Sequence, residues 1–291
     1  MKKIGFIDYY IDEWHANNYP DWIRKSSFKE KYDVAFAWEE KPAEGKRDID
    51  KWCKDFGVEK ANSIKELVEK SDAIIVLSPG WPEYHEKLSD LALTSGKPVY
   101  IDKPIADKYR SAVNIISKAE KYHTPVMSSS ALRFGLELQR LVNGELKSEK
   151  AVFAAARGGG SIRGFVNYGI HQIEILVMTM GFGAARVMQC GNIKANIDVM
   201  AIAYNDGRTG LLNRIPGQGF EVVICKKDGK EHAVKNFGDM FPNMIEAILG
   251  FFDTGKSPVP VEETLEAAAV FDAGIRALAA PGAWVDVPEL K

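Results

Sequence analysis

The sequence predicts an α/β fold in two parts: a doubly wound parallel sheet, and then an α+β domain with an open, mostly antiparallel sheet. In the first 128 residues, short apolar segments alternate with segments whose apolar residues recur at helical spacing, as in crossover-connected parallel strands. From residue 129 onward, β-rich segments are separated by turns such as Asn205-Asp206-Gly207, which are typical of antiparallel hairpins. We therefore expect domains at 1–128 and 129–291.

The first domain contains five segments with the pattern of buried strands: residues 3–7, 34–38, 73–77, 98–101 and 124–127. Between them, Ser63 and Glu66 form a capping-box start for a helix through Glu69. Further helices are expected at 84–94 and 106–121. Residues 9–22, rich in aromatic and amide side chains, are expected to form a loop after the first strand.

The second domain has the pattern of a helix followed by longer strands. Strands are expected at residues 150–157, 184–193, 199–204, 209–214 and 220–226. Helices are expected at 136–142, 171–180 and 265–278. Lys227-Asp228-Gly229 is a second hairpin turn by composition.

The composition is that of a globular protein, with 46% hydrophobic residues in 291 and a formal net charge of −2. Charges of both signs are interspersed, so no basic surplus is available for a nucleic acid. No segment has the length and apolar character of a membrane span, and Asp8 and Asp12 interrupt the N-terminal apolar segment where a signal peptide would continue. We expect a cytoplasmic protein without nucleic-acid or membrane partners.

The cysteines indicate neither a disulfide framework nor a zinc site. There are three of them, Cys53, Cys190 and Cys225, and none is part of a C-x-x-C pair. His171 and Glu174 form an H-x-x-E pair, which without further ligands is weak evidence for a metal. We expect free thiols and no metal.

Lys103 follows an expected strand, together with Asp102 and Pro104. Ligands of doubly wound sheets bind at the carboxyl ends of the strands. A lysine there can donate hydrogen bonds to a substrate hydroxyl, and partial desolvation lowers a lysine pKa toward acid/base use. The alternative is a surface lysine paired with Asp102 or Asp107.

His171 follows the glycine stretch 158–160 and opens the helix expected at 171–180. Histidine titrates near neutral pH and can take a proton from an alcohol as hydride leaves the same carbon. The alternative is a structural histidine on a helix.

An ordered set of motifs runs through nearly the whole chain. They are Asp72-Ala73-Ile74-Ile75-Val76 with Ser78-Pro79 and His85, then residues 96–106 around Asp102-Lys103-Pro104, then Arg133-Phe134, residues 169–174 around His171, and residues 255–260. In this order and spacing, the sequence resembles the glucose-fructose oxidoreductase, inositol dehydrogenase and MocA (Gfo/Idh/MocA) family.

The resemblance implies a Rossmann domain that binds NAD(H) or NADP(H), and a C-terminal open sheet that supplies the substrate pocket and often the oligomer contact. A homodimer or homotetramer is therefore expected. It also implies that Lys103 contacts substrate and cofactor and that His171 is an acid/base, so these are the predicted catalytic residues. The predicted cofactor-binding residues are Ile7, Asp8, Glu39, Ser78, Pro79, Asp102, Lys103 and Arg133, and the predicted substrate-binding residues are Asn167, Tyr168, Arg157 and His85.

Two of these assignments have alternatives. Glu39 or Glu40, after the second strand, can bind a ribose hydroxyl pair and select NAD, or can be an exposed glutamate. Arg133 matches a position near the cofactor, and its guanidinium can instead make a structural ion pair.

The chain departs from the family pattern at its first turn. Family members carry a glycine-rich turn there, because only glycine lets the backbone approach the pyrophosphate at a helix N-terminus. This chain has bulky residues at the expected glycine positions, and Asp8 and Asp12 would repel phosphate. Two further family acids differ: Asn167 stands for an aspartate, and Asp102 for a glutamate. The aromatic residues of 9–22 and 81–85 either line a crevice for a sugar or flat ring, or pack together over an abandoned cofactor site.

Three functions are compatible with these features. The leading one is an NAD(P)-dependent oxidoreductase that transfers hydride between a nicotinamide and a sugar, cyclitol or related polyol. The second is a family relative without dinucleotide chemistry that acts as a carbohydrate-binding, regulatory or scaffolding protein. The third is a sugar lyase or hydrolase that keeps a tightly held cofactor.

Overall fold

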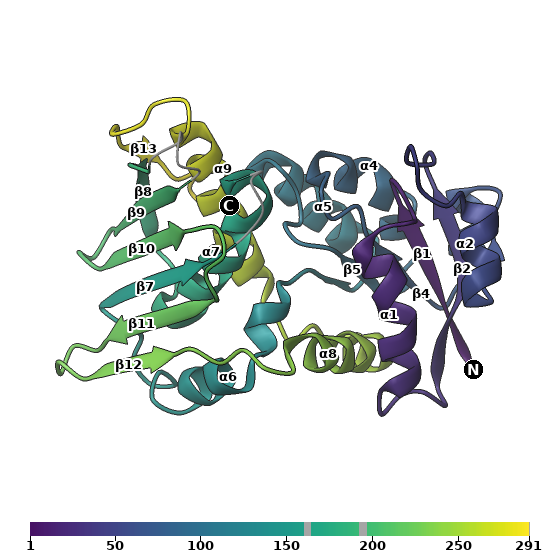
Figure 1. Ribbon diagram of the computed structural model, residues 1–291, viewed down its shortest axis with the longest axis horizontal. Helices are drawn as coiled ribbons and strands as arrows, with labels where there is room; N and C mark the ends of the chain where they lie inside the picture. Colours follow the sequence, from purple (N-terminus) through teal and green to yellow (C-terminus); the bar gives the residue numbers. More distant parts are fainter. Residues whose placement is uncertain (160–163, 192–196, 291) are drawn as a thin grey trace. The chain divides into compact units, whose positions relative to one another are not determined.

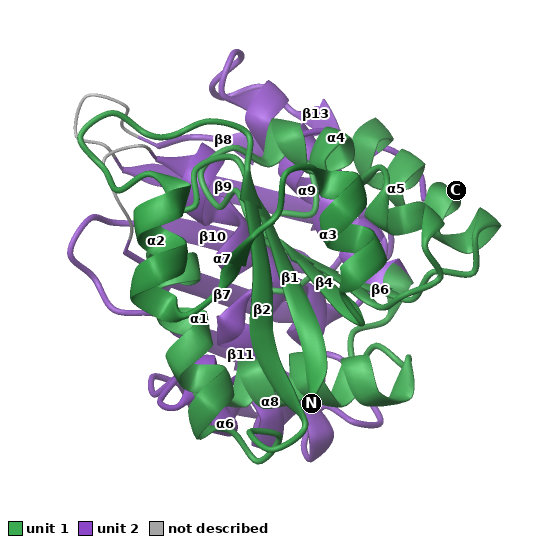
Figure 2. Cartoon of the chain, turned by 90° about the vertical axis from the view of Figure 1, so that its right-hand side faces the viewer, with its two compact units in different colours: residues 1–106, 110–129, 242–261 green, residues 107–109, 130–241, 262–291 purple. Residues whose placement is uncertain are grey.

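The computed structural model describes residues 1–159, 164–191 and 197–290, and the chain forms two compact units (Figure 2). Unit 1 comprises Met1–Ala106, Arg110–Ser129 and Pro242–Val261, and unit 2 comprises Asp107–Tyr109, Ser130–Phe241 and the residues from Glu262 on. The chain changes unit next to the expected boundary at 128/129. The segment 242–261, which we assigned to the second domain, groups with unit 1 instead.

Unit 1 contains a six-stranded sheet in the order β3-β2-β1-β4-β5-β6, and every neighbouring pair is parallel. This is the strand order of the Rossmann fold, so that part of the fold prediction is confirmed. The strands are β1 (Lys2–Asp8), β2 (Tyr32–Glu39), β3 (Glu59–Lys60), β4 (Ala73–Val76), β5 (Val99–Ile101) and β6 (Val126–Met127) (Figure 1).

The helices that accompany this sheet are α1 (Trp14–Lys25), α2 (Ile49–Phe56), α3 (Ile64–Lys70), α4 (His85–Ser89), α5 (Tyr109–Lys121) and α8 (Met240–Thr254). The prediction of a loop over 9–22 was wrong, because α1 begins at Trp14. Its pattern was hidden by Pro20, which lies inside the helix although proline usually interrupts one. The single helix expected over 84–94 is divided into α4 and two 3₁₀ turns, η1 (Pro82–Tyr84) and η2 (Ala92–Thr94).

Gly5 of β1 is a packing glycine. A Cβ atom at this position would lie 2.4 Å from both Leu67 Cδ2 and Ser71 Oγ, closer than real atoms approach. The start of α3 is fixed by Ser63, whose side chain accepts a hydrogen bond from Glu66 N, as the capping box predicts. The chain's glycine in β1 therefore serves the contact with α3.

Unit 2 contains a seven-stranded sheet in the order β12-β11-β7-β10-β9-β8-β13. Only the pair β7 and β10 is parallel, so the predicted mostly antiparallel sheet is confirmed. The strands are β7 (Phe153–Gly158), β8 (Ala184–Gln189), β9 (Asp198–Tyr204), β10 (Thr209–Arg214), β11 (Glu221–Cys225), β12 (Glu231–Val234) and β13 (Val285–Asp286). β8 ends at Gln189. Residue 193, where we expected this strand to end, lies outside the described residues, and so does Gly160 of the predicted glycine stretch.

The helices of unit 2 are α6 (Leu136–Asn143), α7 (Phe165–Met180) and α9 (Val261–Ala277). α7 lies against β7 and β10. It begins six residues before His171, where we expected its start, because the polar residues and Gly169 of its first turns obscured the apolar spacing. His171 is therefore inside the helix.

Among the described residues, no helix has the length and apolar character needed to cross a membrane. Within the same residues, no group of three or more His, Cys, Asp or Glu side chains is placed to hold a metal ion.

Candidate functional site

The carboxyl ends of β1, β4 and β5 meet at one edge of the parallel sheet, because these strands are neighbours. Asp8 is the last residue of β1, Ser78 follows β4, and Asp102 and Lys103 follow β5. This edge is where doubly wound folds bind their ligands. The predicted cofactor residues Ile7 and Pro79 belong to the same edge; the Ile7 side chain is fully buried in the sheet, and Pro79 is partly exposed.

Asp8 is buried and bonds to the chain's own backbone. Its Oδ1 accepts hydrogen bonds from the amides of Tyr9 (2.7 Å), Tyr10 (3.3 Å) and Ser78 (3.0 Å). Its Oδ2 is buried without a hydrogen-bond partner among the described residues. Burial, and after it the charge of Glu13, raises the pKa of Asp8 well above its usual value, against the three amide hydrogen bonds. The carboxyl group thus closes the first turn from inside.

Glu13 occupies the N-terminus of α1. Its Oε2 accepts a hydrogen bond from the amide of His15 at 2.7 Å, and its Oε1 accepts one from the amide of Ala16 at 2.5 Å. These are the free amides that bind an anion at a helix N-terminus. A side-chain carboxylate of the chain already satisfies them.

Glu39, at the end of β2, is engaged in the same way. Its two carboxylate oxygens accept hydrogen bonds from the amides of Ile11 and Ile49, each at 3.1 Å. Burial raises the pKa of Glu39 above its usual value. The residue that we predicted to hold a ribose instead ties two loops to the end of β2.

The aromatic side chains of the two strand-end segments pack on each other. The rings of Tyr9 and Tyr84 stack with centroids 4.1 Å apart, and Trp81 lies beside both Tyr9 and Tyr10. Lys41 lies over the rings of both Tyr9 and Tyr10. Of the two readings of these segments, mutual packing is the one that the structure has.

Asp102 and Lys103 form a different arrangement at the end of β5. Lys103 Nζ lies 3.3 Å from Asp102 Oδ2, and the Lys103 side chain is 11% exposed. Asp102 Oδ2 is buried and has no hydrogen bond of good geometry among the described residues. Burial acts to raise the pKa of Asp102, but the charges of Lys103 and His15 outweigh it, so this pKa is lowered.

His85 contacts the backbone of the residues that follow Lys103. It is fully buried, and its Nδ1 lies 2.9 Å from the carbonyl oxygen of Pro104. Burial lowers the pKa of the imidazole, so the ring is neutral and donates from Nδ1. The structure thus places the predicted substrate residue His85 in the interior, where its ring holds the backbone that follows Lys103.

A dinucleotide on this fold needs open amides at the first turn, a free helix N-terminus, and an acid available to the ribose at the end of β2. In this chain Asp8, Glu13 and Glu39 bond to the chain's own amides at these three places. The carboxyl groups of Asp8 and Glu13 also stand where a pyrophosphate would bring negative charge. The residues present therefore do not fit a dinucleotide docked in the usual way.

In unit 2, α7 carries three predicted site residues on one face. Asn167 and Tyr168 are four and three residues before His171, a spacing that aligns side chains on a helix. The Tyr168 and His171 rings have centroids 5.8 Å apart, and His171 Nδ1 is 2.7 Å from Ser130 Oγ. All three residues are partly exposed, so this face of α7 combines a hydroxyl-oriented imidazole with an amide and a phenol.

Arg133, which we predicted to bind the cofactor, belongs to a buried ion-pair network. Its Nε is 3.2 Å from Glu174 Oε2, and its Nη1 pairs with Glu263. Glu174 Oε1 also accepts a hydrogen bond from Ser130 N at 2.8 Å. The structural ion pair, the stated alternative, is thus what is observed, and it holds the η3 turn (Ala131–Phe134) against α7.

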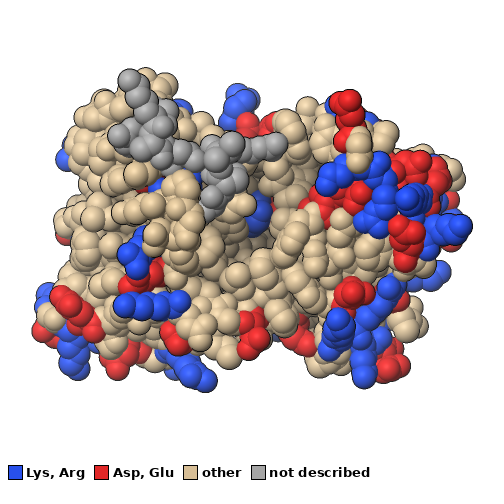
Figure 3. Space-filling model, in the orientation of Figure 1, with Lys and Arg blue, Asp and Glu red and all other residues tan. Residues whose placement is uncertain are grey.

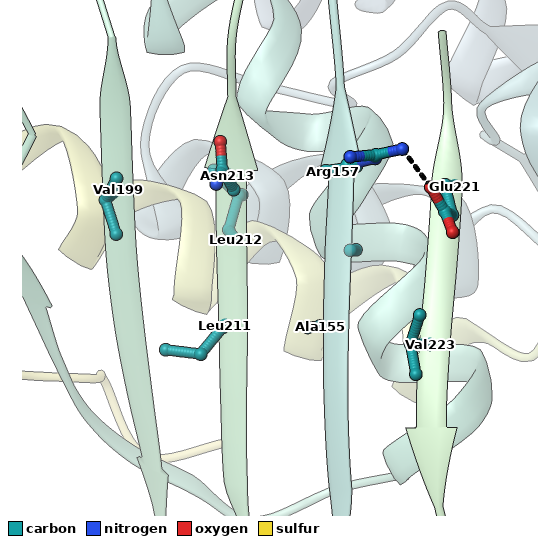
Figure 4. Close-up of a pocket in the computed structure, with 9 residues that line it drawn as sticks. Ala155, Arg157, Val199, Leu211, Leu212, Asn213, Glu221 and Val223 are labelled. Carbon is teal, nitrogen blue, oxygen red and sulfur yellow. Dashed lines mark ion pairs between the residues drawn. The ribbon is translucent and has the colours of Figure 1, made fainter. Parts of the chain in front are cut away.

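Arg157 does not join this group. It lies on the face of the sheet away from α7, paired with Glu221 of β11 and surrounded by apolar residues such as Leu211 and Val223 (Figure 4). The side chain is half exposed. The predicted substrate residue Arg157 therefore lies apart from the residues of α7.

The surface in view in Figure 3 mixes Lys and Arg with Asp and Glu, without a broad area of one sign. This agrees with the interspersed charges of the sequence.

Sequence reasoning missed Glu13 and His15. The aromatic loop was noticed, but the helix within it was not, and the spacing of Asp8, Tyr10 and Glu13 is that of the three glycines in G-x-G-x-x-G.

Comparison with known families agrees with the motifs. Residues 15–130 match the Gfo/Idh/MocA model, described as an oxidoreductase family with an NAD-binding Rossmann fold, which confirms the resemblance over this range. The matched range begins two residues after Glu13. No curated protein matches the chain in sequence.

Solved structures share the fold over the full length. A myo-inositol dehydrogenase from Lactobacillus casei in complex with NAD(H) and myo-inositol has a TM-score of 0.82 at 12% identity, covering 100% of this chain and 98% of that one. A probable dehydrogenase from Thermotoga maritima has a TM-score of 0.81 at 15% identity, covering 98% of each chain. A myo-inositol 2-dehydrogenase from Lactobacillus plantarum has a TM-score of 0.78 at 16% identity, covering 99% of each. At these identities the likeness establishes the fold.

Proposed function

We propose that this chain, whose residues 15–130 carry the pattern of the Gfo/Idh/MocA oxidoreductases, binds a hydroxyl-rich small molecule without holding a dinucleotide at its first turn. One observation carries the proposal. Asp8, Glu13 and Glu39 bond to the amides, or stand at the positions, that a dinucleotide needs. The chain keeps the scaffold of the family and closes its phosphate site.

A sugar or cyclitol is the ligand class that the polar groups suit. At the carboxyl edge of the parallel sheet, Lys103 Nζ is a donor that lies 3.3 Å from Asp102 Oδ2, an acceptor. A hydroxyl group can both donate and accept, so neighbouring hydroxyls pair with such alternating groups. Fold relatives include an inositol dehydrogenase in complex with myo-inositol, which adds support to this class.

The groups on α7 are proposed to serve the same class of ligand. His171 is oriented by Ser130 Oγ and has Asn167 and Tyr168 on its helix face. An oriented imidazole can accept a proton from a hydroxyl. The assignment of His171 as an acid/base comes from the family resemblance.

An NAD(P)-dependent polyol dehydrogenase is the second candidate. It is favoured by the family match and by the partly buried Lys103 at the end of β5. NAD(P) would supply hydride acceptance, and this chain would have to hold it through contacts other than the first turn. The first turn, where Asp8 and Glu13 already occupy the backbone amides, disfavours this candidate. It equally disfavours a lyase or hydrolase with a tightly held dinucleotide.

Titration calorimetry separates the two candidates. The purified protein, checked for copurified nicotinamide by its absorbance, is titrated with NADH, NADPH, myo-inositol, scyllo-inositol and glucose. We expect saturable heat from at least one polyol and none from either dinucleotide. Micromolar binding of NADH or NADPH contradicts the proposal.

Variants of two lysines then locate the binding. Lys103→Met is expected to weaken polyol binding at least tenfold, and Lys87→Met, which removes an exposed lysine of the same unit, is expected to leave it unchanged. Equal affinities of the two variants contradict the role of Lys103.

A further inference from the structure

Phe220 precedes β11 and brings an aromatic ring to His171 of α7. The ring centroids of Phe220 and His171 are 5.8 Å apart, and the two ring planes are inclined at 69°. Glu221, the next residue in the chain, pairs with Arg157 on the other face of the sheet (Figure 4). The phenyl ring and the imidazole thus form two sides of a corner within unit 2.

The Phe220 ring is held by close neighbours. A Cβ atom on Gly158 of β7 would lie 2.3 Å from Phe220 Cδ1 and 2.6 Å from Nε2 of Gln172 in α7, so a larger residue at this position would displace the ring. The Phe237 ring has its centroid 6.5 Å from that of Phe220 and is itself buried in contact with Gly135. A ring packed in this way loses little conformational freedom when a ligand binds to it.

The corner has a polar side and an apolar side. The polar groups come from α7: the imidazole of His171, the phenol of Tyr168 and the amide of Asn167. Tyr168 lies with its ring centroid 5.8 Å from that of His171, and Ser130 Oγ holds His171 Nδ1 at 2.7 Å. Phe220 presents only carbon and hydrogen, and like the three residues of α7 it is partly exposed.

A ring-shaped polyol matches such a corner. In a cyclitol or pyranose with equatorial hydroxyls, the hydroxyls point outward from the rim of the ring, and its two faces carry C–H groups. The negative face of an aromatic ring attracts these hydrogens, and the removal of apolar surface from water adds to the attraction. An open-chain polyol has no fixed face of this kind, and it loses more conformational freedom when it binds.

We propose that Phe220 is the specificity residue of the site formed by Asn167, Tyr168 and His171, and that it selects cyclic polyols over open-chain polyols. The C–H face of the ligand ring lies on Phe220, and a hydroxyl at its rim meets His171. This inference rests on the proposed function, since it assumes a hydroxyl-rich ligand, and it adds the shape of ligand that the site takes.

Calorimetry compares three cyclic ligands, scyllo-inositol, myo-inositol and glucose, with the open-chain polyol glucitol. Scyllo-inositol and glucitol have the same numbers of carbons and hydroxyls, so they differ chiefly in ring closure. We expect the tightest cyclic ligand to bind the native protein at least tenfold more tightly than glucitol, whose weaker constant is measured by displacement.

Three variants test whether Phe220 causes this preference. In Phe220→Ala the ratio of the two affinities is expected to fall about fivefold, through weaker binding of the cyclic ligand. Phe220→Tyr keeps the ring and is expected to keep the native ratio. Phe182→Ala is the matched control, because Phe182 is a phenylalanine of unit 2 that is 45% exposed, and it is expected to bind like the native protein. Thermal melts check that all three variants are folded.

NMR of the native protein gives a readout that needs no variant. With protein labelled at phenylalanine, we expect NOEs between the ring protons of Phe220 and the axial C–H protons of the bound cyclic ligand. The same ligand protons are expected to shift upfield, because they lie over the face of an aromatic ring.

The outcomes distinguish the two proposals. An unchanged affinity ratio in folded Phe220→Ala overturns this inference and leaves the proposed function standing. So does a native protein that binds glucitol as tightly as the cyclic ligands, or a bound cyclic ligand without NOEs to Phe220. Failure of all four polyols to bind the native protein overturns the proposed function, and with it this inference.

Discussion

Strands β1 and β5 of the parallel sheet each lead into an aspartate at the same edge, and the two carboxyl groups are used in opposite ways. Asp8 accepts hydrogen bonds from three backbone amides, and its pKa is raised by burial. Asp102 Oδ2 is buried and lies 3.3 Å from Lys103 Nζ, and its pKa is lowered because nearby positive charge, Lys103 first, outweighs burial. The first carboxyl group has become part of the loop structure, whereas the second forms an ion pair with Lys103. The same sheet edge therefore carries one carboxyl group bonded to the backbone and one paired with a lysine side chain.

Among the variants that test this comparison, Asp8→Ala is expected to lower the free energy of unfolding most. It leaves three amides, two of them in buried hydrogen bonds, without their acceptor, so we expect a loss of roughly 2–4 kcal/mol in the free energy of unfolding. Urea denaturation measures it. Asp8→Asn keeps an acceptor oxygen and removes the buried charge, and is expected to be much closer to the native protein. Equal losses in the two variants would show that the hydrogen bonds from the three amides to Asp8 do not contribute to stability.

Gly5→Ala tests the structural use of the glycine that remains in β1. The added methyl group would overlap Leu67 and Ser71, so we expect a loss of about 1–3 kcal/mol. Gly219→Ala is the control, because a Cβ atom there meets no other atom within 4 Å. Thermal or urea unfolding of both variants checks the prediction, and similar stabilities would show that β1 and α3 are not closely packed at Gly5.

Glu13→Ala is expected to have a smaller effect on stability, about 1 kcal/mol, because it removes a helix N-cap. Ser63→Ala removes the N-cap of α3 and provides the comparison within the same unit. Both are measured by urea denaturation. Only Glu13→Ala is expected to remove the contact with His15 Nδ1 and so to shift the ring resonances of His15 in NMR spectra. The same shift in Ser63→Ala would indicate a general loss of structure.

The two aspartates also predict opposite dependences of stability on pH. Since the folded-state pKa of Asp8 is raised, its contribution is present below its unfolded value and is lost as pH rises through the folded value. Since the folded-state pKa of Asp102 is lowered, its contribution is present above its unfolded value and is lost as pH falls through the folded value.

Urea midpoints across a pH series are therefore expected to fall less on the alkaline side in Asp8→Asn than in the native protein. In Asp102→Asn they are expected to fall less on the acid side. The same slope change in both variants would contradict the opposite roles of the two groups.

Local patterns were sufficient to predict a parallel sheet in unit 1 and to place Lys103 directly after a strand, because apolar strand segments and their ends are visible in consecutive residues. The partners of Asp8 were not predictable in this way: Ser78 is 70 residues away and is brought near only by the pairing of β1 with β4. Helix α1 was missed because Pro20 and the aromatic residues are typical of a loop. Its N-cap, Glu13, was missed for the same reason. The sequence alone did not show which face of β7 Arg157 would occupy; successive strand residues alternate, and Arg157 lies on the exposed face, away from α7.

Amide NMR during a titration with NAD⁺ tests the central claim most directly. The amides of Tyr9, Tyr10, Ser78, His15 and Ala16 are those that Asp8 and Glu13 already bind. We predict that their resonances do not move at millimolar NAD⁺, because the carboxylates are not displaced. Saturable shifts confined to these five amides would show that a dinucleotide phosphate reaches the turn, and would contradict the account.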